Sequence, residues 1–179
     1  DDAINYGAIG MVIGHEMSHG FDDRGRLYDK NGNLESWWTE QDSKRFEERT
    51  EVLVEQHNNI VIIDDLHADG KLTLGENIAD LGGLNIALTA FRNAQKENPQ
   101  PEVIDGFTKE QRFFLAYARV WANNMRDKEK IRYTKEDEHP IPVNRVNAPL
   151  ANMPEFHAAF GVKQGDALFI SEDERASIW

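Results

Sequence analysis

The chain has 179 residues, 40% of them hydrophobic and 9% aromatic, which is typical of one globular domain with its own core rather than of a disordered chain. Its formal net charge of −12 argues against binding to nucleic acid or to an anionic membrane, because phosphate groups would be repelled. The absence of cysteine excludes disulfides and thiolate zinc sites, so a transition-metal site would have to use histidine and carboxylate ligands.

No apolar run approaches membrane-spanning length, so we expect no membrane contact by this segment and no signal peptide within it. The chain starts at Asp1 without an initiator methionine and runs almost at once into a helix pattern. We therefore expect residues 1–179 to be a single domain that belongs to a longer protein.

The first predicted helix begins at an aspartate cap and ends before Gly20. Several of its apolar positions suit a buried helix: Ile4, Ala8, Met11 and Val12. It also carries three glycines on or near one face: Gly7, Gly10 and Gly14. They would allow a ligand or another backbone to approach closely, and close helix packing explains Gly7 and Gly10 at least as well.

Capping residues and apolar periodicity predict five helices: 1–19, 39–59, 72–96, 108–125 and 154–160. Within the third, Gly82-Gly83 indicates tight packing. Between these helices we expect a short ribbon around 26–28 and 33–34, an apolar link at 61–63, a polar loop at 64–70 and an extended segment at 140–142. Residues 128–139 form a charged stretch to which no helix or strand is assigned. The fold class is therefore mainly α, or α+β with minor strand content.

The motif His15-Glu16-Met17-Ser18-His19 lies in the first predicted helix. Histidines four residues apart share one helix face, where both can bind a single Zn²⁺. Glu16 projects beside them and can hold a water molecule and take its proton. A motif this short also occurs by chance, so its context must decide its meaning.

A zinc site of this kind needs a third protein ligand. A histidine six residues after His19, used by one class of zinc sites, is excluded because Gly25 occupies that position. Glu40 lies in the first turn of a charged helix, where an acid is common, so we interpret it as structural. Glu76 and Asp80 share a helix face, so that one could bind the metal while the other orients an imidazole. A solvent-exposed acid pair explains the same spacing equally well.

The motif and the segments that follow it resemble the neprilysin family of zinc metalloendopeptidases, in the C-terminal part of the catalytic domain and with closest likeness to its bacterial oligopeptidase branch. The matching segments run in family order along the chain: 5–14, 20–23, 37–39, 74–80, 82–83, Val120-Trp121, His139, Arg145 and Trp179. The resemblance implies a thermolysin-like (gluzincin) catalytic domain. In it, the helix with the histidine motif packs on a long helix that carries the third ligand.

The resemblance implies one Zn²⁺ per chain, held by His15, His19 and Glu76, with Asp80 orienting His15. It also implies that Asp137, His139 and Arg145 stabilise the charged tetrahedral intermediate, while Glu16 acts as the base. From the residues alone, His139 would be interpreted as an exposed loop histidine.

Four further residues match positions that line the family's pocket for the residue after the scissile bond: Met11, Val12, Val120 and Trp121. Core packing explains all four as well. The resemblance implies hydrolysis of oligopeptides on the amino side of large hydrophobic residues.

A zinc-holding peptide-binding module is the alternative function, although a pure binder would not need Glu16. A structural zinc domain would require a fourth protein ligand, and we find no candidate for one. The expected partners are an oligopeptide substrate and the upstream part of the longer protein, with the family's edge strand and lid domain. This segment does not fix the compartment, and the resemblance favours the bacterial cell envelope or secretion over the cytoplasm.

Overall fold

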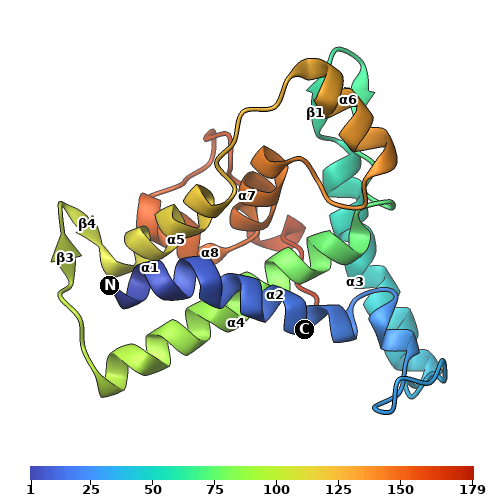
Figure 1. The fold of residues 1–179 in the computed structure, drawn as a ribbon, viewed down its shortest axis with the longest axis horizontal. Helices are drawn as coiled ribbons and strands as arrows, with labels where there is room; N and C mark the ends of the chain where they lie inside the picture. The colour runs from blue at the N-terminus through green and yellow to red at the C-terminus, as the bar shows by residue number, and fades with distance from the viewer.

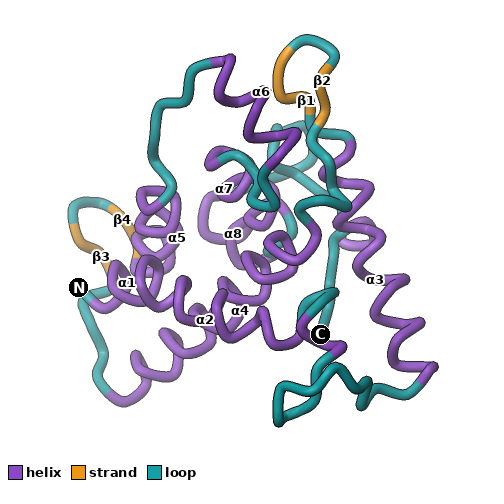
Figure 2. Tube along the Cα trace, turned by 45° about the vertical axis from the view of Figure 1, so that its right-hand side comes forward, coloured by secondary structure: helices purple, strands orange, loops and turns teal.

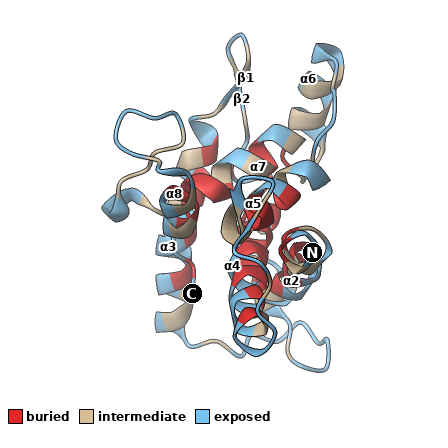
Figure 3. Ribbon diagram, turned by 90° about the vertical axis from the view of Figure 1, so that its left-hand side faces the viewer, coloured by how far each residue is buried: buried red, intermediate tan, exposed pale blue.

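The computed structural model, which describes residues 1–179, is organised around one long central helix, α4 (Leu74–Glu97). Figure 3 shows that buried residues concentrate along α4 and on the helix surfaces that face it. Seven other α-helices surround or extend from this centre: α1 (Asp2–Asn5), α2 (Met11–Ser18), α3 (Glu40–Asn58), α5 (Lys109–Val120), α6 (Asp127–Glu136), α7 (Pro142–Ala151) and α8 (Pro154–Phe160). The predicted mainly helical fold is therefore confirmed (Figure 1).

The first predicted helix is confirmed as a continuous helical segment with a π-helical turn inside it. Asp1 caps α1 by accepting a hydrogen bond from Ala3 N at 2.9 Å. A π turn (Tyr6–Gly10) joins α1 to α2, and a 3₁₀ turn (His19–Phe21) follows α2. Such π turns occur mostly as single insertions in α-helices, often next to functional sites.

Glycines set how closely α2 can approach α4. A Cβ atom on Gly83 would lie 2.5 Å from His15 N, and one on Gly14 would lie 2.8 Å from Gly83 O. Gly7 faces Phe113 O of α5 in the same way, at 2.1 Å. The predicted close packing is confirmed at these three positions. Gly10 differs, because its nearest neighbours belong to its own helical segment.

Capping explains the other predicted helices. Thr39 accepts a hydrogen bond from Asp42 N at the start of α3, and Thr108 forms a capping box with Gln111 at the start of α5. Helix α8 matches its predicted range, whereas α5 ends at Val120, before the predicted end at residue 125.

One helix was not predicted, and one predicted extended segment is confirmed in part. The charged stretch forms α6, because ion pairs within one turn, such as Arg132 with Glu129 and Glu136, support it. The predicted extended segment is confirmed at Pro140 and Ile141, which lie outside any helix, with Ile141 at φ −58° and ψ 147°, whereas Pro142 already lies in the first turn of α7. Proline suits that position because it has no N–H to leave unpaired.

Two antiparallel hairpins lie at the edges of the fold (Figure 2): β1 (Val61–Ile63) with β2 (Leu66–His67), and β3 (Val103–Ile104) with β4 (Phe107–Thr108). The apolar link at 61–63 is thus a strand. Asp105 and Gly106 have φ values of 51° and 83°, which suit a two-residue hairpin turn. The predicted ribbon around 26–28 and 33–34 is wrong, since a 3₁₀ turn (Gly25–Leu27) occupies part of it.

One face of the first helical segment remains apolar and exposed, contrary to the prediction that Ile4 is buried. Four side chains on this segment are 51–60% exposed: Ile4, Ile9, Ile13 and Met17. None of the helices combines the length and the apolar character needed to cross a membrane.

Candidate metal centre

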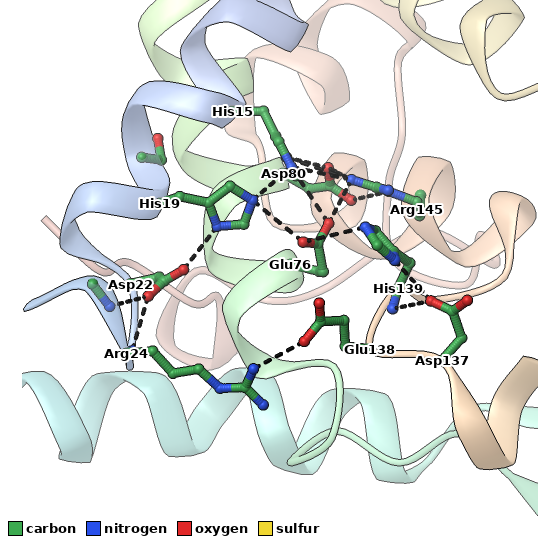
Figure 4. Close-up of polar contacts among 12 residues, drawn as sticks. His15, His19, Asp22, Arg24, Glu76, Asp80, Asp137, Glu138, His139 and Arg145 are labelled. Atoms are coloured by element: carbon green, nitrogen blue, oxygen red, sulfur yellow. Dashed lines mark hydrogen bonds and ion pairs between the residues drawn. The ribbon is translucent and has the colours of Figure 1, made fainter.

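Two histidines and a glutamate converge where α2 packs against the first turn of α4 (Figure 4). The Nε2 atoms of His15 and His19 lie 3.0 Å apart. Glu76 presents Oε2 at 3.4 Å from His15 Nε2 and Oε1 at 3.3 Å from His19 Nε2. The helical spacing of the histidines and the close approach of α2 to α4 thus bring all three side chains to one point.

A carboxylate fixes the outer nitrogen of each imidazole. Asp80 Oδ1 lies 2.9 Å from His15 Nδ1, and Asp22 Oδ2 lies 2.7 Å from His19 Nδ1. Because a carboxylate accepts hydrogen bonds, each Nδ1 donates, and each Nε2 is left with its lone pair directed inward.

This donor set suits zinc. Two imidazole lone pairs facing each other repel unless a cation lies between them. Glu76 Oε2 is buried and accepts no well-aligned hydrogen bond, although Arg145 Nη2 lies 3.0 Å away. Tetrahedral Zn²⁺ with Zn–N bonds of about 2.0–2.1 Å would separate its ligand atoms by roughly 3.3 Å, close to the observed spacings.

Arg145, on α7, forms the buried wall of the site. Its Nε and Nη2 donate to the two carboxylate oxygens of Asp80 at 2.9 and 2.7 Å. The guanidinium carbon lies 4.0 Å from the centre of the Trp121 ring, and Tyr117 donates a hydrogen bond to the Arg145 carbonyl. Paired and stacked in this way, the guanidinium is held in one orientation.

Burial and charge act against each other on the protonation of these groups. Burial acts to lower the pKa of His15, but the neighbouring Asp80 and Glu76 carboxylates raise it to about 9 when no metal is bound, and a bound cation would take the place of the Nε2 proton. Burial acts to raise the pKa of Glu76, yet His15, Arg145 and His139 lower it overall. The Glu76 carboxylate therefore stays charged and draws positive charge to this point.

His139 approaches the site from the segment between α6 and α7. Its Nε2 lies 3.5 Å from Glu76 Oε1, and its Nδ1 lies 2.7 Å from Asp137 Oδ1. Asp137 also accepts a hydrogen bond from His139 N, and despite partial burial these bonds lower the pKa of Asp137. The structure thus brings His139 and Arg145 to the Glu76 carboxylate.

The Glu16 side chain is exposed and makes no hydrogen bond or ion pair within the protein, so its carboxylate is available to solvent.

Of the four predicted pocket residues, Trp121 lines a groove of about 440 Å³ beside Arg145, together with Ile141 and Val146. Val12 packs against the core, and Val120 is 42% exposed outside that groove.

Met11 is fully buried in the core cluster and faces no groove. Core packing therefore accounts for its burial, and its place in the pocket stays a prediction. The physical reason for the burial is the close α2–α4 contact, which turns Met11 toward α4 and away from solvent.

Sequence reasoning missed the contact of Asp22 with His19, because Asp22 reads as a turn residue. It is indeed a turn residue: its Oδ1 accepts hydrogen bonds from Arg24 N and Gly25 N at 2.8 and 2.6 Å. The same carboxylate reaches His19 with Oδ2. Its spacing of three residues after a candidate ligand is the signal that could have revealed the contact.

Comparison with known proteins agrees with this geometry. Residues 1–176 match the sequence profile of Peptidase family M13. The chain belongs to this family. The predicted resemblance to neprilysins is therefore confirmed, since neprilysin from Homo sapiens is 37% identical over 182 residues, covering 99% of this chain and 24% of that protein. An endothelin-converting enzyme homolog from Locusta migratoria is 42% identical over 168 residues, covering 93% of this chain and 23% of that protein.

Solved structures of this family share the fold. The inhibitor complex of the Mycobacterium tuberculosis zinc metalloprotease Zmp1 superposes with a TM-score of 0.95 and 45% identity, over 100% of this chain and 28% of that one. PepO from Lactobacillus rhamnosis gives a TM-score of 0.86 and 36% identity, over 100% of this chain and 27% of that one. The chain thus spans about a quarter of the length of these relatives.

Proposed function

We propose that this M13 chain forms the metal-binding catalytic unit of a zinc-dependent endopeptidase, with residues 1–179 as one domain of a longer protein. The observation that carries the proposal is the convergence of His15, His19 and Glu76, with each imidazole oriented by its own carboxylate. These three side chains would hold one Zn²⁺ per chain, and the two aspartates would fix the ring orientations.

When bound, zinc supplies Lewis-acid chemistry that acidifies a water molecule and polarises a carbonyl group. Glu16 is the general base: its exposed carboxylate takes a proton from the attacking water and delivers it to the leaving nitrogen. This role explains why a glutamate without partners lies beside the histidine pair.

Arg145 and His139 would stabilise the oxyanion that develops on the substrate carbonyl. Arg145 has Nη1 free of hydrogen bonds within the protein, while its Nε and Nη2 are anchored on Asp80. His139, oriented by Asp137, directs Nε2 toward the same point and can donate from it when the ring is protonated. A fixed donor reorganises little as charge develops, which is the source of its catalytic value.

The groove beside Arg145 supports cleavage on the amino side of large hydrophobic residues of an oligopeptide. Its walls include apolar side chains from two directions, Trp121 after α5 and Ile141 and Val146 near and on α7. Its volume of about 440 Å³ is enough for one large apolar side chain. Trp121 connects this groove to the reaction site through its contact with Arg145.

The exposed apolar face of the first helical segment supports a second partner, the upstream part of the longer protein. Ile9, Ile13 and Met17 are 60%, 55% and 60% exposed on neighbouring turns. Soluble proteins rarely leave such a stripe uncovered. An edge strand or lid domain from the remaining three quarters of the relatives' length would cover it.

The decisive experiment is Glu16→Gln in the full-length protein. We expect about one bound zinc per chain, as in the wild type, but a loss of about 10²–10⁴-fold in the hydrolysis of a quenched fluorescent peptide, because the base is gone. A chelator should abolish wild-type cleavage, and added zinc should restore it.

Glu40→Gln, the same change at an exposed position in the first turn of α3, is the matched control and should keep full activity. Unchanged cleavage by the Glu16 variant would contradict the proposal. Zinc-dependent peptide binding without hydrolysis by the wild type would instead favour the zinc-holding binding module.

A further inference from the structure

The segment that carries His139 is weakly attached to the rest of the fold on its upstream side. Helix α6 has no buried residue, and it extends beside the β1–β2 hairpin, away from the core (Figures 1 and 3). Its side-chain ion pairs, such as Lys130 with Asp127 and Arg132 with Glu129, are internal to the helix. On the downstream side, by contrast, Pro140 and Ile141 are buried.

One side-chain polar contact connects residues 127–138, which precede His139, to another element. Glu138 Oε2 lies 2.9 Å from Arg24 Nη1, across 114 residues of sequence. The other side-chain hydrogen bonds and ion pairs of residues 127–138 stay within the segment or reach the adjacent His139. Figure 4 shows this pair bridging the turn after α2 and the His139 segment.

Each residue of the Arg24–Glu138 ion pair adjoins a residue of the metal centre. Arg24 N donates to Asp22, whose other oxygen contacts His19 Nδ1 at 2.7 Å. Glu138 directly precedes His139, whose Nε2 faces Glu76. Arg24 and Glu138 also line a cavity of about 190 Å³ that opens on His19 and Glu76.

We propose that Arg24 and Glu138 are positioning residues that hold His139 at the reaction site, an inference that rests on the proposed endopeptidase function. The ion pair ties the C-terminal end of a loosely packed helix to the turn after the histidine motif. Neither side chain needs to touch the substrate, because both act through the placement of His139. The pair is exposed, at 69% and 53% for the two side chains, so its contribution should be modest and sensitive to salt.

A charge-reversal cycle in the full-length protein tests this inference. We expect Arg24→Glu and Glu138→Arg each to lower kcat about two- to fivefold with little change in KM or zinc content. Loss of an exposed ion pair typically changes an equilibrium by about this factor. The double variant, which restores the pair with reversed charges, should recover most of the lost kcat. High salt should lower wild-type kcat and raise that of the single variants, because it screens the attraction in the first case and the repulsion between like charges in the second.

Hydrogen exchange gives a readout that does not depend on activity. The amides of residues 127–139 should exchange severalfold faster in Glu138→Arg than in the wild type and return toward wild-type rates in the double variant. Arg132→Glu is the matched control, because it breaks exposed ion pairs on α6 that reach no other element. It should leave kcat unchanged.

Single variants with wild-type kcat and exchange rates would overturn the inference, as would a double variant no better than either single one. These outcomes differ from failure of the proposed function, in which the wild type itself would show no chelator-sensitive cleavage.

Discussion

The two sides of the candidate metal centre are built differently. On the inner side, His15, Glu76, Asp80 and Arg145 are 1–7% exposed and lie on three helices packed together. On the outer side, His19 and His139 are half-exposed, and turns and a loop orient them through Asp22 and Asp137. The inner side depends on helix packing, and the outer side depends on local hydrogen bonds and one exposed ion pair.

This difference separates two requirements of a hydrolytic site. A buried carboxylate–arginine network keeps ligands and charges in one geometry, since leaving any member unpaired would be costly. A peptide must also enter, which requires one side that can be reached from solvent. The inner side should therefore tolerate substitutions poorly, whereas the outer side should show graded effects.

The largest effect is expected where α2 meets α4. Gly83→Ala places a Cβ atom 2.5 Å from His15 N, a backbone atom that cannot move without shifting the metal ligand. We expect a loss of about 3 kcal/mol in the free energy of unfolding, together with loss of zinc binding. Urea unfolding followed by circular dichroism measures the stability.

Gly20→Ala is the control for that variant, because a Cβ atom there meets nothing within 4 Å. Its unfolding free energy should stay within about 0.5 kcal/mol of the wild type. Equal stability of the two variants would show that the α2–α4 contact is less tight than the structure indicates.

A comparison of the two orienting aspartates sharpens the contrast between inner and outer sides. Asp80→Asn should weaken zinc binding about 100-fold and cost about 3 kcal/mol of stability, because buried Arg145 loses its charged partner. Asp22→Asn should weaken zinc binding only about tenfold, since His19 is partly exposed and water can replace the carboxylate. Competition with a fluorescent zinc chelator measures both affinities. A larger loss for Asp22→Asn would reverse the assignment of the two sides.

The smallest of the three effects is expected at Asp137. Asp137→Asn should lower kcat about tenfold and leave zinc affinity unchanged, because it disturbs the orientation of His139 but leaves the His139 imidazole in place as a hydrogen-bond donor. Steady-state kinetics with the same quenched peptide, together with zinc analysis, checks this. If zinc were lost as well, Asp137 would belong to the support of the metal ligands.

Part of this architecture could be predicted from local sequence. Helices α3, α4 and α8 were predicted because caps at Thr39, apolar periodicity after Leu74 and a proline at residue 154 all act within a few residues. The hairpin at Asp105-Gly106 was missed although its turn signal was present, since strands of two residues are too short to show alternation. Helix α6 was missed because a stretch of charges without apolar periodicity resembles a loop.

The candidate site also combines features that the sequence predicts with contacts that only the fold reveals. The spacing of His15 and His19 already places both rings on one helix face, and the resemblance to neprilysins supplied Glu76, Asp80, His139 and Arg145 as their companions. Their partners followed only from the fold: Asp22 is a turn residue by sequence and an imidazole partner in space. Glu138 has no sequence signal at all, because its contact lies 114 residues away.

By itself, the sequence determined the helical character of this protein, its lack of thiolate ligands and the zinc-binding spacing of its histidine motif. These depend on residue type and on short helical periods, which act locally. The tertiary structure alone decided which carboxylate faces which imidazole, how the Arg145 guanidinium is held, and that one ion pair connects the His139 segment to the turn after the motif. Such contacts join residues distant in sequence, and the packing of α2, α4 and α7 fixes their geometry.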